Sequence, residues 1–218
     1  MKSTPDALWT LSRDELSMAL EPHYLNMREL LSDSERKQIT FDQAVDSAYD
    51  RLRHAAARNF TFTQASALVR NDLSPCAFAV AVVVADSFII LFQFCGINQA
   101  QARAATRALL QELGEETLRG LRANIHDIVN ATSSYQQAVE IWKLLSSVSN
   151  VIGISSIVTA LTRTMHWYDW TISAIIIAAQ LTAWFASDGA ALIAELALES
   201  VYVGQLVADA ITAAEQCG

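Results

Sequence analysis

Proline is absent from the last 143 residues of this chain, and this absence constrains the fold more than any other sequence feature. The 218 residues contain only 3 prolines, at positions 5, 22 and 75, and 7 glycines. Proline and glycine are the residues that most often end helices and build turns, so a long stretch with so few of them favours helices. With 52% hydrophobic residues, the chain can also bury a sizeable core. The sequence therefore predicts an all-α fold.

Helix starts are marked by a recurring capping pattern, in which Ser, Thr or Asn is followed three residues later by Glu or Gln. The pattern occurs at Ser12/Glu15, Ser32/Glu35, Thr40/Gln43, Thr61/Gln64, Asn98/Gln101 and Ser134/Gln137. We predict helices over residues 12–20, 23–38 (in one or two pieces), 41–58, 62–71, 75–95, 98–113, 115–131, 134–149, 151–165, 169–187 and 189–215. The best strand candidate, residues 77–85, runs unbroken into further apolar residues and follows Pro75, which suits a first helical turn, so helix is favoured there too.

A shift in composition near residue 75 divides the chain into two regions. Residues 1–75 predict charged amphipathic helices, whose Asp42, Asp46 and Asp50 recur every four residues as expected for a solvated face. Residues 76–218 predict mainly apolar helices. No linker rich in Gly, Ser or Pro separates the regions. We therefore expect one domain over residues 1–218, a multi-helix bundle with a hydrophobic C-terminal helical hairpin at 170–214.

Charge is distributed unevenly along the chain. The net charge is -8, and residues 164–218 contain six carboxylates but no lysine or arginine. An acidic chain is a poor ligand for nucleic acid, so we expect no nucleic-acid partner. An apolar segment whose carboxylates can be protonated gains affinity for membranes as the pH falls. This region is therefore predicted to insert into a bilayer under acidic conditions.

The predicted hairpin consists of two apolar arms around the turn Ser187-Asp188-Gly189. Its arms, residues 170–186 and 190–208, have 17 and 19 residues, against the roughly 17 to 25 that span a bilayer. Asp188 can cap the second helix and Gly189 can end the first. The segment is long enough to enter a membrane.

Glu195 and Glu199 lie one turn apart on the second arm. An ionised acid at a helix centre costs about 2.5 to 3.5 kcal/mol on insertion, whereas each Leu, Ile, Val or Phe contributes only about 0.3 to 0.6. Neutralising both glutamates would remove most of that penalty, so we predict that they gate insertion together with Asp188. The alternative is an exposed glutamate pair on an ordinary amphipathic helix.

Asp86 is the only charged residue in the 20-residue run from Cys76 to Cys95. In a core helix it would need a partner such as an arginine or a capping amide. Otherwise the run is a third insertion element, and Asp86 is the fourth gating residue.

Trp167, Trp170 and Trp184 border the first arm of the hairpin. Tryptophan favours the boundary between water and lipid, so we predict that these three residues anchor the inserted segment. Packing between helices is the alternative role.

The cysteines and the N-terminus bear on the compartment. Cys76, Cys95 and Cys217 have wide spacings without a metal-ligand pattern, so a reducing compartment or at most one disulfide fits. Residues 1–18 lack the apolar core of a conventional signal peptide. We expect a soluble protein that, if exported, leaves by a non-conventional route and then associates with membranes.

Enzyme motifs are missing from the sequence. We find no GxSxG, HExxH, P-loop or GxGxxG motif, no DDxxD and no Glu-x-x-His. The chain is therefore predicted not to be an enzyme, and no metal or cofactor is expected.

A hydrophobic hairpin sheltered by amphipathic helices resembles, in architecture, the α-helical pore-forming and translocation domains of bacterial toxins. No family motif is matched, so no residue role follows from the resemblance. The resulting hypothesis is a membrane-active, pore-forming protein whose partners are a lipid membrane and either further copies of itself or a second protein component. The alternative is a soluble helical bundle that serves as a protein-binding module.

Overall fold

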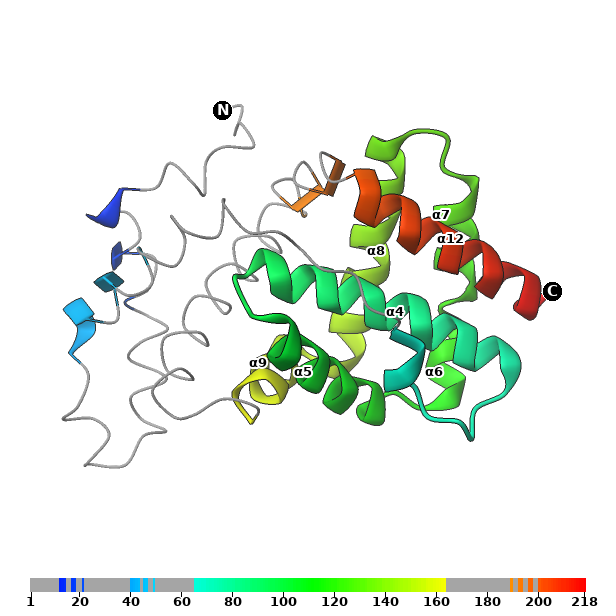
Figure 1. The fold of residues 1–218 in the computed structure, drawn as a ribbon, viewed down its shortest axis with the longest axis horizontal. Coiled ribbons are helices and arrows are strands. Elements are labelled where there is room, and N and C mark those ends of the chain that lie inside the picture. Colours follow the sequence, from blue (N-terminus) through cyan, green and yellow to red (C-terminus); the bar gives the residue numbers. More distant parts are fainter. Residues whose placement is uncertain are drawn as a thin grey trace.

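A computed structural model describes residues 65–163 and 200–218 continuously, with isolated positions in the ranges 12–49 and 189–197. All regular structure in these residues is helical, which confirms the all-α prediction for this part of the chain. The elements are a short 3-10 helix η2 (Ala65–Leu68) and the α-helices α4 (Pro75–Phe94), α5 (Gln99–Glu112), α6 (Glu115–Gly120), α7 (Arg122–Asn130), α8 (Ser134–Ile152), α9 (Ile154–Thr162) and α12 (Ser200–Cys217). They form a multi-helix bundle (Figure 1).

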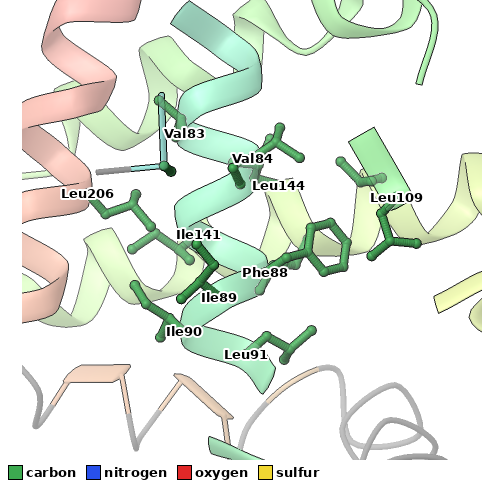
Figure 2. Packing of buried hydrophobic residues seen from close by; sticks show 14 of the residues in the cluster. Val83, Val84, Phe88, Ile89, Ile90, Leu91, Leu109, Ile141, Leu144 and Leu206 are labelled. Carbon is green, nitrogen blue, oxygen red and sulfur yellow. The ribbon is translucent and has the colours of Figure 1, made fainter. Parts of the chain in front are cut away.

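Helix α4 lies at the centre of this bundle. Helices α5, α6, α8 and α12 and the η2 turn all pack against it (Figure 1). Sixteen of its 20 residues are buried. Figure 2 shows its side chains meeting Leu109 of α5, Ile141 and Leu144 of α8 and Leu206 of α12. A helix that is apolar on every side is stable in water only when other elements bury it almost completely. The composition of α4 therefore explains its central position.

Side-chain hydrogen bonds cap the predicted helix starts at Asn98 and Thr40. The backbone N–H of Gln101 donates to the Asn98 side chain at 3.0 Å, and Gln43 and Thr40 exchange two such bonds at 3.0 and 3.3 Å. Pro75 occupies the first turn of α4, as expected. The predicted box at Ser134/Gln137 is wrong by one residue. Ser133 is the cap of α8, and it accepts from the N–H of Gln136 at 3.2 Å.

Three predicted helices are corrected by the structure. Of the helix expected over residues 62–71, the described part is the short 3-10 helix η2, and residues 69–71 are not helical. Residues 115–131 form two helices, α6 and α7, which meet at Leu121. The boundary expected near residue 150 lies instead at Gly153, where α8 and α9 meet at 90°. Gly153 has φ +80° and ψ 147°, a conformation that is essentially restricted to glycine. The bend is therefore encoded by a single residue.

Candidate functional site

The structure describes one of the seven predicted site residues. Asp86 lies midway along α4. The remaining predicted residues lie outside the described part of the chain, and their gating and anchoring roles stay predictions: Asp188, Glu195, Glu199, Trp167, Trp170 and Trp184.

The turn predicted for the hairpin is described at Gly189. This residue has φ +75°, and its carbonyl accepts a hydrogen bond from the N–H of Ile193 at 2.8 Å, as at the start of a helix. A side chain at this position would overlap the indole ring of Trp142 in α8. Gly189 therefore docks a turn tightly against the bundle. The hairpin over residues 170–214 stays a prediction.

Helix α4 is the candidate insertion element that the structure describes. Among the described helices, α4 alone is long and apolar enough to cross a membrane, although most of its surface is buried. Helices α8 and α9 meet the same criteria only when they are counted together across their 90° bend. The apolar run that the sequence singles out is thus a core helix in this state of the molecule.

Asp86 is a buried carboxyl in the middle of this helix. Only 3% of the residue is exposed. The pKa of Asp86 is raised to about 8, chiefly by burial and further by the hydrogen bond and the charge of Asp209, while the charge of Arg103 acts to lower it. At pH 7 the folded protein therefore holds Asp86 mainly in its protonated form, which can donate a hydrogen bond to the Asp209 carboxylate.

The partner of Asp86 differs from the expected one. An arginine or a capping amide was predicted, but the hydrogen-bond partner is the carboxyl of Asp209 on α12, while Arg103 of α5 acts through its charge. Asp209 is itself half-buried, and its Oδ2 accepts from Gln205 Nε2 at 3.4 Å. The result is a polar contact between two carboxyl groups in the α4–α12 interface.

A disulfide bond joins the same two helices at their ends. Cys76, in the first turn of α4, is bonded to Cys217, the last residue of α12, with 4.6 Å between their Cα atoms and 141 residues between them in sequence. Sequence reasoning allowed for one bridge but did not identify its cysteines. Cys95, the third cysteine, is buried and is not part of a disulfide.

The disulfide and the carboxyl contact are spaced alike on both helices. Ten residues separate Cys76 from Asp86 on α4, and eight separate Asp209 from Cys217 on α12. At 1.5 Å per residue these intervals are about 15 and 12 Å. Figure 1 shows α4 and α12 running in opposite directions, with the C-terminus near the start of α4. The two links therefore lie along one antiparallel contact.

No group of three or more His, Cys, Asp or Glu residues is placed to hold a metal within the described residues. The expectations that the chain uses no metal or cofactor, and that it is not an enzyme, stay predictions.

Comparison with known proteins returned no match: no protein-family model, no curated protein and no solved structure resembles this chain. Its function must be inferred from the geometry described above.

Proposed function

We propose that this chain is a membrane-active protein of the pore-forming type, which folds in water as a closed bundle and inserts apolar helices into a lipid bilayer. The observation that supports this proposal most is α4. Its 20 residues correspond to a length of about 30 Å, which is the thickness of the hydrocarbon core. Amphipathic helices surround it, so that the bundle shelters one membrane-length segment from water.

The energetics of insertion are favourable for α4 once its carboxyl is neutral. The helix contains eleven Val, Ile, Leu and Phe residues, which together contribute about 3 to 7 kcal/mol on insertion scales, while an ionised Asp at the centre costs about 2.5 to 3.5 kcal/mol. Because Asp86 is already mainly protonated in the bundle at pH 7, α4 can leave without taking up another proton. An acid trigger would therefore reside in Asp188, Glu195 and Glu199.

Insertion requires the bundle to open. The helices that cover α4 must separate from it, and α12 stays tethered to its first turn as long as the disulfide is intact. We infer that the inserted form contains α4 with the predicted hairpin, in association with further copies of the chain or a second protein component. A disulfide-bonded chain fits an extracellular setting.

Dye release from lipid vesicles tests the proposal. We expect the purified chain to release dye from anionic or neutral vesicles at some pH between 4.5 and 8. The double variant Glu195→Gln/Glu199→Gln should shift the midpoint of release to higher pH, whereas Glu116→Gln, on the exposed surface of α6, should leave it unchanged. Absence of release at every pH, with a folded protein, would contradict the proposal.

A second function is favoured by the burial of α4. A helix covered on all sides is also what an ordinary soluble bundle requires at its centre, and such a bundle would serve as a protein-binding module. Its acidic C-terminal region would favour a basic partner. A folded protein that never releases dye but binds a basic protein in a salt-dependent manner would support this alternative.

A further inference from the structure

We propose that the Cys76–Cys217 disulfide can be reduced by thiols and holds α12 against α4. After its reduction, a rise in pH separates α12 from α4 at the Asp86–Asp209 contact. This inference concerns the closed bundle alone and does not depend on membrane activity.

The disulfide is accessible to a reductant, and it attaches the end of α12 covalently to α4. Cys76 and Cys217 are partly exposed, so the thiolate of a dithiol reductant can attack one of the two sulfur atoms. A mixed disulfide forms, the second thiol of the reductant displaces the remaining protein sulfur, and the products are two protein thiols and an oxidised cyclic dithiol. The end of α12 is then no longer covalently attached to α4.

The fully buried side chains of α12 near this end are small. Its buried residues are Val203, Leu206, Ala210 and Ala213, so the larger side chains lie in the first half of the helix and only alanines lie in the second half. Alanine buries little apolar surface. Helix α12 also packs against α7 and α8, and near its C-terminal end the disulfide and the contact of Asp209 with Asp86 add to this packing.

The carboxyl contact depends on one proton. Protonated Asp86 donates to Asp209, but after Asp86 ionises, two carboxylates face each other in a place with little water, and repulsion favours separation of the helices. Of the charged groups on all helices that pack against α4 or α12, within the described residues, Asp209 and Arg103 are the two that shift the pKa of Asp86. Arg103 reduces the repulsion but belongs to α5, so it does not hold α12.

The two links act in sequence. While the disulfide is closed, the ends of α4 and α12 stay within 4.6 Å between their Cα atoms, and ionisation of Asp86 cannot move the helices far apart. After reduction, the same ionisation releases the C-terminal half of α12. Separation of α12 from α4 therefore requires both reduction of the disulfide and a rise in pH.

Hydrogen exchange of the intact chain tests this inference. Protection factors, corrected for intrinsic exchange, would be measured for amides 206–217 at pH 6 and pH 9, with and without a dithiol reductant. For the oxidised protein we expect the ratio of α12 protection to α8 protection to agree within about threefold between the two pH values. For the reduced protein we expect this ratio to be at least tenfold lower at pH 9 than at pH 6. The amides of α8 serve as an internal reference, because global unfolding would affect them equally.

Two variants separate the roles of the two links. Asp86→Asn keeps the shape of the side chain and cannot ionise, so the reduced variant should lose the pH dependence of α12. Glu215→Gln, on the exposed side of α12, should retain it. A reduced wild-type protein whose α12 stays protected at pH 9, or an equal loss in reduced Asp86→Asn, would overturn the inference. Loss of α8 protection to the same extent as α12 would overturn it as well.

Discussion

Helices α4 and α12 are similar in length and lie against each other, yet they occupy opposite kinds of environment. Sixteen of the 20 residues of α4 are buried, whereas α12 buries a stripe formed by Val203, Leu206, Ala210 and Ala213 and leaves the residues between them half-buried or exposed. The difference follows from pattern and not from overall hydrophobicity. An uninterrupted apolar run becomes the centre of the bundle, and an apolar run with polar residues at helical spacing becomes one of its covers.

The polar residues of the two helices follow the same contrast. Asp86 of α4 is fully surrounded and its pKa is raised to about 8, while Asp209 of α12 is half-buried and Glu215 is exposed. A carboxyl in the central helix thus influences the stability of the whole bundle, whereas a carboxyl in the covering helix acts at its edge.

Removing the covalent link between the two helices should have the largest effect. The double variant Cys76→Ser/Cys217→Ser releases a loop closed over 141 residues, which corresponds to about 5 kcal/mol of chain entropy in the unfolded state. We expect the free energy of unfolding in urea to fall by roughly that amount. A decrease below about 1 kcal/mol would show that the bridge contributes little to the α4–α12 contact.

Truncation of a core side chain should distinguish the central helix from its cover. Phe88 of α4 is 1% exposed and lies with its ring centroid 5.7 Å from that of Phe92, so Phe88→Ala should lower the free energy of unfolding by about 3 to 5 kcal/mol. Ile211→Ala, at a position in α12 that is 44% exposed, should cost less than about 1 kcal/mol. Equal losses in urea titrations would contradict the central position of α4.

The pH dependence of stability should identify the buried carboxyl. Because the pKa of Asp86 is higher in the folded state than its ordinary value, the fold binds a proton that the unfolded chain releases. The stability from this group is complete below about pH 4 and is lost as the pH rises toward 8, by about 1.4 kcal/mol per pH unit.

Two substitutions check this assignment by urea unfolding at pH 5 and pH 7. Between these values the wild-type protein should lose about 2 to 3 kcal/mol more than Asp86→Asn does. Glu215→Gln should retain the wild-type slope. An unchanged slope in Asp86→Asn would assign the buried proton to a different group.

Substitution of two glycines by alanine, at positions 189 and 204, should change the stability of the protein in opposite directions. Gly189→Ala introduces a side chain at φ +75° against Trp142, which should destabilise the protein by about 1 to 3 kcal/mol. Gly204 lies inside α12 with no neighbouring atom where a side chain would be placed, so Gly204→Ala should stabilise by about 0.5 to 1 kcal/mol. Thermal unfolding of both variants provides the measurement, and a stable Gly189→Ala protein would argue against the docked turn.

Local features of the fold were predictable from the sequence because they depend on neighbouring residues. The capping bonds at Asn98 and Thr40 and the start of α4 at Pro75 each involve side chains within a few positions of each other. At α8 the sequence offers Thr132, Ser133 and Ser134 as competing caps, and the pattern alone selected the wrong one. The boundary between α8 and α9 was expected near residue 150 and lies at Gly153. Its position depends on the positive φ of Gly153, and the capping pattern does not reveal which residue adopts that conformation.

The links between α4 and α12 were not predictable in the same way. The cysteines that form the bridge are 141 residues apart, and no local pattern relates them. The partner of Asp86 was expected to carry a positive charge or an amide, whereas packing brings Asp209 there. The matched intervals, Cys76 to Asp86 and Asp209 to Cys217, are the sequence signal that could have suggested an antiparallel pair.

The central place of α4 has a consequence for how this protein is made. Of the described elements that pack against α4, only η2 precedes it in the chain, while α5, α6, α8 and α12 follow. During synthesis, which proceeds from the N-terminus, the ribosome therefore exposes a membrane-length apolar segment before these four described helices exist to cover it. During biogenesis, burial of α4 by the later helices therefore competes with binding of α4 to lipid or to a chaperone.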